Sequence, residues 1–322
     1  MGKKKSDCQD RGACGFESYY SEIFGTRWNL LKEALQKETS PVPYKISESS
    51  KTYFLDSASI FAAYSLPLKN AEEILDLCAA PGGKTLILSS LMEKNASLTC
   101  NERSFDRKMR LVKVCDECMP EDIRSRVKIT CSDGALWCRT KTECFDRILL
   151  DVPCSSERHV LNDEKYLNQW SPARIKTLSI EQWALLSSAY RMLKKDGILL
   201  YSTCALSHKE NDDVIERLLK KFDDAEIIFL DSEFYIQNKN DIERVKEFSP
   251  QFSLIHPERT QFGYHILPDM QNGAGPIFFS IIRKKNELQA EIKSPLIEQE
   301  APDIAMDKLT EKEYEDPFKG SK

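Results

Sequence analysis

Short apolar runs alternate with longer amphipathic segments from residue 74 onwards. The runs have the length and β-branched content of strands, and the segments between them have helical spacing. This alternation predicts a mostly parallel sheet with helices on both faces, a Rossmann-like α/β fold that ends in an antiparallel edge strand. The expected strands are 74–78, 97–101, 127–131, 147–152, 198–202, 226–230 and 276–282, and the expected helices are 85–93, 105–118, 172–194 and 209–222.

The segment ahead of these runs has a different pattern. Apolar side chains at three- and four-residue spacing between Phe16 and Leu35 predict a helix, and a second helix is expected over 54–64. Within the α/β region, Ser171 and Pro172 are a favourable helix start, and Gly197 is expected to end that helix. The expected organisation is a disordered segment 1–14, a small N-terminal helical extension 15–70, an α/β domain 71–284 and a polar, disordered tail 285–322.

Composition narrows the class of protein. Of 322 residues, 41% are hydrophobic and 30% charged, which is typical of a soluble globular chain. No apolar run reaches the ~18 residues that a membrane span needs, so no membrane association is expected. The net charge of −5 argues against a generally basic nucleic-acid binder, so any nucleic acid would have to bind a local basic surface.

Cysteine usage points to a reducing compartment. The chain has 11 cysteines and no apolar signal segment, which favours free thiols in the cytoplasm over disulfides. The early acids Asp7, Asp10 and Glu17 argue against a mitochondrial presequence. Cys115 and Cys118 form a CxxC inside an expected helix without a second pair at metal-binding spacing, so no metal is expected.

A turn of small residues, Cys78 to Lys84, follows the first expected strand and leads into a helix. In a doubly wound sheet this turn is where a nucleoside cofactor binds, because small side chains let the backbone approach the ligand. Glu102 ends the next strand, where a carboxylate can bind ribose hydroxyls, and Asp133 ends the third, beside the adenine position. A phosphate loop or a purely structural turn are the alternatives, but S-adenosylmethionine (SAM) is the leading ligand.

Two cysteines follow two later strands. Asp151-Val152-Pro153-Cys154 follows one strand, and Thr203-Cys204 follows the next. Both cysteines should therefore lie at the same edge of the sheet as the cofactor turn. The alternative is that they are small buried apolar residues, as free cysteines often are.

Such a pair suits one chemistry. A thiolate that adds to carbon 6 of a cytosine makes carbon 5 an enamine carbon that can attack a sulfonium methyl. Asp151 is placed to donate a proton or a hydrogen bond to ring nitrogen 3. A second thiolate could then remove the carbon 5 proton. These considerations leave open which of Cys154 and Cys204 plays which role.

The segments LDLCAAPGGKT, DVPCSS and YSTCALS, in this order and spacing, resemble the Sun-domain (Nol/Nop/Sun) family of RNA cytosine-5 methyltransferases. The likeness covers residues 53–284 and is greatest to compact members that methylate ribosomal or transfer RNA in bacteria and mitochondria. It implies that Cys204 is the nucleophile, that Cys154 releases the product, that Asp151 lies at the cytosine and that Lys84 points into the active site.

The resemblance also implies which residues bind cofactor and substrate. Asp56 and Ser59 match a short family motif that lines the approach to the site, and Pro153 and Arg158, which flank Cys154, are further candidates for substrate contact. The implied SAM contacts are Cys78, Ala79, Ala80, Pro81, Gly82, Gly83, Lys84, Glu102, Asp133 and Asp151.

Some positions depart from the family or leave its RNA contacts open. Val152 stands where many members have alanine, and the segment before Tyr53 is short, so no further RNA-binding domain is expected there. Trp170 could pack on RNA or anchor a local core. His159 and His208 flank the two cysteines in sequence and could act on a thiol or be ordinary surface residues. Basic residues that could contact RNA, or be solvated charges, are Arg27, Lys32, Arg103, Arg107, Lys108, Arg158, Arg174 and Lys176.

The expected function is SAM-dependent methylation of cytidine carbon 5 in RNA by a monomeric enzyme. Small-subunit ribosomal RNA, free or within the ribosomal subunit, is the first expected substrate and transfer RNA the second. A DNA cytosine-5 methyltransferase is a rival, because there the cysteine of the Pro-Cys motif is the nucleophile, but Thr203-Cys204 disfavours it. A rival of another class is a non-catalytic ribosome-assembly factor, which would have no need for both cysteines.

Overall fold

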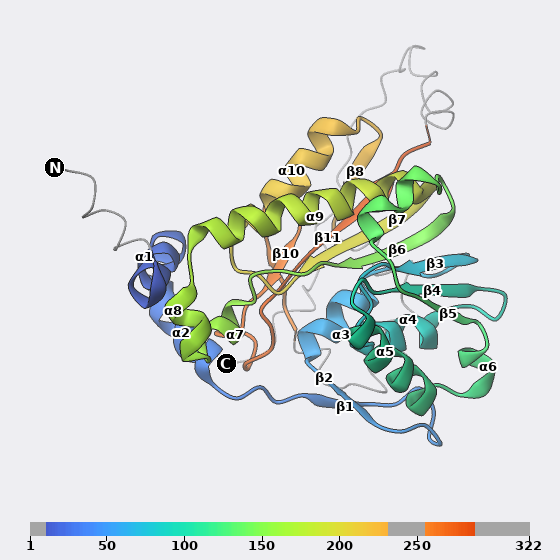
Figure 1. The fold of residues 1–322 in the computed structure, drawn as a ribbon, viewed down its shortest axis with the longest axis horizontal. Helices are drawn as coiled ribbons and strands as arrows, with labels where there is room; N and C mark the ends of the chain where they lie inside the picture. Colours follow the sequence, from blue (N-terminus) through green and yellow to red (C-terminus); the bar gives the residue numbers. More distant parts are fainter. Residues whose placement is uncertain (1–10, 231–254, 287–322) are drawn as a thin grey trace, which may run out of the picture. The chain divides into compact units, whose positions relative to one another are not determined.

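A mixed sheet forms the centre of the protein (Figure 1). The computed structural model describes residues 11–230 and 255–286. In that part the nine-stranded sheet has the order β5-β4-β3-β6-β7-β11-β10-β9, and β8 also pairs with β11. The strands are β3 (Glu73–Asp76), β4 (Ser97–Asn101), β5 (Val127–Thr130), β6 (Phe145–Asp151), β7 (Leu193–Thr203), β8 (Ala225–Ile228), β9 (Glu258–Arg259), β10 (Tyr264–Ile266) and β11 (Ile277–Lys284).

The first five strands of that order are parallel and the rest are antiparallel. Asp151 of β6 lies opposite Ser202 of β7 in the parallel part. On the other side of β7, Thr203 pairs with Phe278 of the antiparallel β11. The prediction of a Rossmann-like, mostly parallel sheet with an antiparallel edge is therefore confirmed.

Helices cover both faces of the sheet because successive strand residues point to opposite sides. Leu149 packs with α3, α4 and α5, whereas Leu150 packs with α9 and α10. The helices of the α/β part are α3 (Ser57–Tyr64), α4 (Gly83–Leu91), α5 (Phe105–Cys118), α6 (Glu121–Arg124), α7 (Glu157–Leu161), α8 (Glu164–Gln169), α9 (Pro172–Met192) and α10 (Asp212–Lys221).

The N-terminal extension has its own aromatic core. Its helices are α1 (Gly12–Phe24) and α2 (Trp28–Gln36), followed by a hairpin of β1 (Val42–Tyr44) and β2 (Tyr53–Leu55). Phe16, Tyr20 and Trp28 pack against Trp170, which is 2% exposed. Trp170 is therefore a core anchor, and its predicted alternative role of packing on RNA is excluded by its burial.

The predicted end of the long helix is wrong. Helix α9 ends at Met192, and Gly197 lies inside β7, which begins at Leu193. The start of β7 is irregular: Asp196 has φ +61°, and the pairing with β6 shifts in register before Ile198. A Cβ at Gly197 would lie 2.8 Å from the Lys194 carbonyl oxygen, so the glycine serves this bulge rather than a helix end.

Other differences are local. Residues 157–169 form two short helices that the apolar pattern does not indicate, and Asp163 caps the second by accepting from the Lys165 and Tyr166 amides. The predicted disorder of 1–14 is wrong at its end, because α1 begins at Gly12. Residues 1–10 and the tail from 287 lie outside the described residues. No helix in the described ranges is long and apolar enough to cross a membrane.

The aromatic core makes a stability prediction. Trp170→Ala should lower the free energy of unfolding by about 3–5 kcal/mol, because a buried indole is lost and a cavity remains. Tyr166→Ala on the neighbouring helix α8 is the control, since Tyr166 is 40% exposed and should cost about 1 kcal/mol or less. Urea unfolding followed by fluorescence measures both, and equal losses would contradict this description of the extension.

Candidate active site

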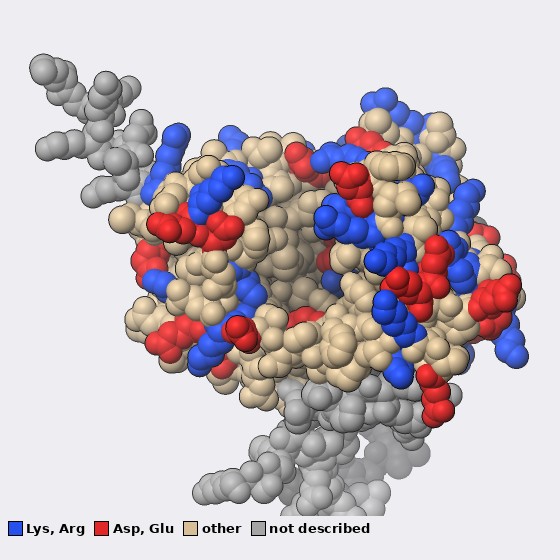
Figure 2. All heavy atoms as spheres, turned by 60° about the horizontal axis from the view of Figure 1, so that its bottom comes forward, with Lys and Arg blue, Asp and Glu red and all other residues tan. Residues whose placement is uncertain are grey.

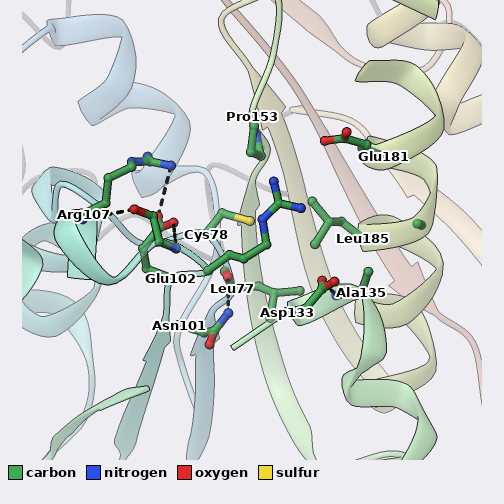
Figure 3. A pocket seen from close by; sticks show the side chains of 14 residues that line it. Leu77, Cys78, Asn101, Glu102, Arg107, Asp133, Ala135, Pro153, Glu181 and Leu185 are labelled. Carbon is green, nitrogen blue, oxygen red and sulfur yellow. Dashed lines mark hydrogen bonds and ion pairs between the residues drawn. The ribbon is translucent and has the colours of Figure 1, made fainter. Parts of the chain in front are cut away.

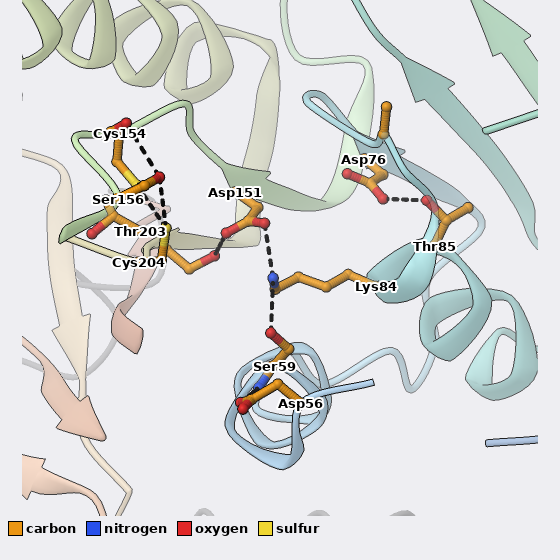
Figure 4. A network of polar contacts seen from close by, with 12 residues as sticks. Asp56, Ser59, Asp76, Lys84, Thr85, Asp151, Cys154, Ser156, Thr203 and Cys204 are labelled. Carbon is orange, nitrogen blue, oxygen red and sulfur yellow. Dashed lines mark hydrogen bonds and ion pairs between the residues drawn. The ribbon is translucent and has the colours of Figure 1, made fainter. Parts of the chain in front are cut away.

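The two motif cysteines meet at the carboxyl edge of the sheet (Figure 4). Cys154 follows β6 and Cys204 follows β7, and because these strands are parallel neighbours their ends lie side by side. The two Sγ atoms are 2.9 Å apart, and both cysteines are free thiols. The fold thus brings together two residues that are 50 positions apart in the sequence.

The surroundings make the two thiols chemically different. The contact with Cys154 and that with the Ser156 hydroxyl 3.3 Å away lower the pKa of Cys204, although burial opposes this. The same contact with Cys204, together with burial, raises the pKa of Cys154 well above its usual value. These opposite shifts favour the thiolate form at Cys204 and the thiol form at Cys154. Ser156 was not singled out from the sequence.

An ion pair stands next to the thiols. Nζ of Lys84 lies 2.8 Å from Oδ2 of Asp151, and the Ser202 hydroxyl donates to Oδ1 of the same carboxylate at 2.8 Å. Burial opposes the charge on Lys84, but attraction to Asp151 outweighs it and raises the pKa of Lys84. Lys84 also reaches the Ser59 hydroxyl at 3.5 Å, so its ammonium lies between α3 and the sheet (Figure 4).

A cavity of about 450 Å³ opens at Cys204. Asp56 borders it and accepts hydrogen bonds from the Ala58 and Ser59 amides at the start of α3, and from the Gly275 amide. Its carboxylate therefore joins α3 to the turn before β11. The lining residues are Thr39, Asp56, Ser59, Ser156, Arg158, His159, Asn162, Cys204, Gly275, Pro276 and Ile277.

Arg158 lines this cavity, but its hydrogen bonds go to the protein. Its guanidinium donates to the carbonyls of Gly273 and Gly275 and to those of Ala34, Leu35 and Lys37 at the end of α2. Cations suit a helix C-terminus because unpaired carbonyls gather there. Arg158 therefore joins the N-terminal extension to the wall of the cavity, and its contact with substrate stays a prediction.

A second cavity of about 450 Å³ lies at the ends of β3 and β4 (Figure 3). Glu102 accepts from the Ser104 amide through Oε1, while its buried Oε2 accepts no hydrogen bond and has Arg107 3.2 Å away. Asp133 faces the same space and caps the following turn through the Ala135 amide. The lining residues are Leu77, Cys78, Asn101, Glu102, Arg103, Ser104, Arg107, Asp133, Gly134, Ala135, Pro153, Glu181, Ala184 and Leu185.

These residues fit SAM. Oε2 of Glu102 forms an ion pair with Arg107 but accepts no hydrogen bond in the described residues, and a ribose hydroxyl would donate one to it. Gly134 is required where it stands, because a Cβ there would lie 2.9 Å from Leu77. Cys78, Glu102 and Asp133 of the predicted cofactor set line this cavity, together with Pro153, which was predicted to contact substrate.

Apart from Gly82, the rest of the predicted turn lines a smaller cavity of about 180 Å³. Ala79, Ala80, Pro81, Gly83, Lys84 and Asp151 border it. It shares Cys78 with the cofactor cavity, and Asp56 and Ser59 with the cavity at Cys204, so it connects the two.

The two glycines of the turn meet steric demands of the fold. Gly82 has φ +119° and precedes α4, and a Cβ at Gly83 would lie 2.2 Å from the Leu55 side chain of β2. Below the turn, the Thr85 hydroxyl donates to Asp76, which is 1% exposed. Burial raises the pKa of Asp76 to about 7. The sequence pattern did not single out this pair.

Several basic residues that were candidate RNA contacts are engaged within the protein. Arg107 donates to the Ala80 carbonyl at 2.6 Å and so holds the cofactor turn. Arg27 pairs with Glu258 and Asp269. Lys and Arg side chains nevertheless border a hollow on one face of the molecule (Figure 2). In the described ranges, no group of three or more His, Cys, Asp or Glu residues is placed to hold a metal ion.

Comparison with known proteins places these motifs in a family. Residues 63–271 match the model of a family described as 16S rRNA methyltransferase RsmB/F. The chain is 32% identical over 233 residues to the 5-cytosine rRNA methyltransferase NSUN4 of Bos taurus, which covers 70% of the chain and 58% of that protein. It is 31% identical to the mitochondrial tRNA (cytosine(34)-C(5))-methyltransferase of Danio rerio, over 72% of the chain and 60% of that protein.

Other similarities are shorter or concern the fold. The ribosomal RNA small subunit methyltransferase F of Aeromonas salmonicida is 39% identical over 182 residues, 56% of the chain and 37% of that protein. A solved methyltransferase homolog from Pyrococcus horikoshii shares the fold with a TM-score of 0.58 at 21% identity, over 83% of this chain and 93% of that one.

The chain spans between about a third and 60% of the length of these curated relatives. The matched region nevertheless exceeds half of the chain, and it contains the cofactor turn and both cysteine motifs. The resemblance inferred from the three motifs is confirmed: this chain belongs to the RsmB/F (Nol/Nop/Sun) family of SAM-dependent RNA cytosine-5 methyltransferases.

Proposed function

We propose that the chain methylates carbon 5 of a cytidine in RNA through a covalent bond between Cys204 and carbon 6 of the base. The observation that carries this proposal is the pair of unlike thiols, 2.9 Å apart, beside the Lys84–Asp151 ion pair. A thiolate that lies against a thiol suits a reaction that needs one nucleophile and one proton-transfer group. A cavity of about 450 Å³ at Cys204 offers room for a base turned out of its stack.

The first step uses Cys204. Its thiolate adds to carbon 6, the electrons of the 5,6 double bond move toward carbon 5 and ring nitrogen 3, and nitrogen 3 takes up a proton that the Lys84 ammonium supplies by way of Asp151, 2.8 Å away. Asp151 is placed to hold that nitrogen by a hydrogen bond, and Lys84 and Ser202 keep the carboxylate in position. Carbon 5 then has the electron density of an enamine.

The last step uses Cys154. S-adenosylmethionine, when bound, supplies the electrophilic methyl group that carbon 5 takes. Once the Cys204 sulfur is bonded to carbon 6, Cys154 gives its thiol proton to solvent, and its thiolate, beside Cys204, removes the carbon 5 proton as a base. The electron pair of that C–H bond restores the ring double bond, the bond to the Cys204 sulfur breaks with its electrons on sulfur, and ring nitrogen 3 returns its proton through Asp151 to Lys84.

The proposed substrate is small-subunit ribosomal RNA, with transfer RNA as the second candidate. The family description and the names of two similar relatives refer to ribosomal RNA, and the name of a third refers to transfer RNA. Because the net charge is −5, binding should rely on a local basic surface such as the one that borders the hollow in Figure 2.

The two cysteines should behave oppositely when replaced. Cys154→Ala should accumulate a covalent protein–RNA adduct, because the carbon 5 proton stays and the bond to Cys204 cannot break. Cys204→Ala should form no adduct and lose at least about a thousandfold in methyl transfer. Denaturing gels with a radiolabelled small-subunit rRNA transcript measure the adduct. If Cys204→Ala still methylates, the cysteine of the Pro-Cys motif is the nucleophile, as in DNA cytosine-5 methyltransferases.

Glu102 should determine SAM affinity. Glu102→Gln should weaken binding about tenfold, because a charged acceptor for ribose hydroxyls becomes a neutral amide. Isothermal titration of the RNA-free protein with SAM measures this without turnover. The control is Glu121→Gln, on the exposed surface of α6. Unchanged affinity in Glu102→Gln would mean that the cavity at β4 is not the SAM site.

A further inference from the structure

Two buried carboxyl groups lie beneath the cysteine loops. Glu157 begins α7, three residues after Cys154, and Glu210 ends the short 3-10 helix that follows Cys204. Both are 0% exposed. The hydroxyl of Ser155 lies between them in hydrogen-bond contact with Oε1 of Glu157 and Oε2 of Glu210.

The hydrogens of this contact can be counted. A serine hydroxyl has one hydrogen, so it can donate to only one of two carboxyl groups. The other contact with Ser155 needs a hydrogen from the carboxyl side. At least one of Glu157 and Glu210 must therefore be a neutral carboxylic acid.

The remaining contacts show which one. Both oxygens of Glu157 already accept, Oε1 from the Tyr20 hydroxyl and Oε2 from the Leu206 amide at 3.1 Å. Glu157 therefore behaves as an ionised acceptor. Its Oε1 can also accept a hydrogen bond from the Ser155 hydroxyl.

Glu210 has the complementary arrangement. Its Oε1 accepts from the Ser155 amide at 3.0 Å and from Nε2 of Gln182 at 2.8 Å. Its Oε2 has the Ser155 hydroxyl as its hydrogen-bond partner among the described residues. Oε2 of Glu210 is thus the position for the proton, and the hydrogen bonds run from Glu210 through Ser155 to Glu157.

We propose that Glu210 is a neutral acid and that its proton holds the loops carrying Cys154 and Cys204 in position relative to each other. Glu157 and Glu210 are then positioning residues for the reaction. This inference rests on the proposed roles of the two cysteines. Ser155 is the neighbour of Cys154, and Leu206 is two residues from Cys204. A single carboxylate, that of Glu157, therefore binds both loops.

The same network reaches the N-terminal extension. Tyr20 of α1 donates to Glu157, and the neighbouring Tyr19 contacts the Ser207 hydroxyl at 2.9 Å. The N-terminal extension therefore contacts the cysteine loops through these hydrogen bonds, in addition to packing against Trp170. Glu157 and Glu210 line neither of the two large cavities, so they act through the loops and not on a ligand.

Burial gives the pair a pH dependence. It raises the pKa of Glu210 to about 7, and it also raises the pKa of Glu157. Titratable groups that interact with the pair are Tyr19, Tyr20, Cys154, Tyr201, Cys204 and, near Tyr19, Asp213, and the basic His208 and Lys209 directly precede Glu210 in the chain.

The direction in which pH changes the stability of the fold follows from proton binding by Glu210. The folded protein holds the Glu210 proton to a higher pH than the unfolded chain does. The stability that this proton contributes is therefore complete below the unfolded pKa and is lost as the pH rises through about 7.

Replacing glutamate by glutamine at position 157 and at position 210 tests the proposal. In Glu210→Gln the amide nitrogen can donate to Ser155 as the acid does, and the oxygen keeps both acceptor bonds. In Glu157→Gln the amide nitrogen is a hydrogen-bond donor where the carboxylate oxygen was an acceptor, so it faces a group that itself donates to Glu157. Glu157→Gln should therefore lower kcat about ten- to a hundredfold, and Glu210→Gln should lower it much less, with KM for SAM unchanged in both.

A second readout needs neither RNA nor turnover. The Tm of Glu210→Gln minus that of the wild type should increase from about pH 5 to about pH 8, because only the wild type loses a proton there. The matched control is Glu216→Gln on the exposed side of α10, where Glu216 pairs with Lys220; its Tm difference should not follow this curve.

Two results would overturn the proposal: equal loss of kcat in Glu157→Gln and Glu210→Gln, or a Tm difference for Glu210→Gln that does not change with pH. If Glu157→Gln does not fold, the Tm curve of Glu210→Gln still decides. Because that curve is measured without RNA, its outcome is separate from that of the adduct experiment on Cys204, which tests the proposed function itself.

Discussion

The contact between Cys154 and Cys204 is the interaction on which the account of this protein depends. It exists because β6 and β7 are parallel neighbours, so the loops after them leave the sheet at one edge. The two sulfurs are 2.9 Å apart, and this contact lowers the pKa of Cys204 and raises that of Cys154. The ion pair of Lys84 and Asp151, the network of Glu157 and Glu210, and the N-terminal extension all bear on the position of these two sulfurs.

The cavities around this contact explain how one fold can bring two ligands together. The cofactor cavity lies at the ends of β3 and β4, and the proposed base cavity lies at the end of β7. The smaller cavity between them is bordered by Lys84 and Asp151 and shares residues with both. A methyl donor and a base would therefore approach each other across the residues that the mechanism requires. The arrangement follows from strand order, because ligands of open α/β sheets bind beyond the carboxyl ends of the strands.

Features that depend on where a strand ends could be predicted from the sequence. Features that depend on contacts between loops far apart in the sequence could not. Glu102, Asp133 and Cys204 were predicted to lie at one edge of the sheet because each stands just after an apolar run, and they line the cavities there. The structural role of Arg158 was missed because its carbonyl partners lie more than 110 residues away in sequence, at the end of α2 and in the turn before β11. Glu157 and Glu210 gave no signal, since nothing local shows that two acids will share one buried serine. Gly197 was misread because a bulge and a helix end require the same residue.

The most direct test of the central claim is bisulfite sequencing of total RNA from cells with this protein, without it, and with its Cys204→Ala variant. We expect one cytosine, in small-subunit ribosomal RNA or transfer RNA, to be methylated in the first cells and unmethylated in both others. That result would identify the substrate and the nucleophile together. If no cytosine changes between the three, the chain does not methylate RNA at carbon 5 in those cells, and the proposed function is wrong.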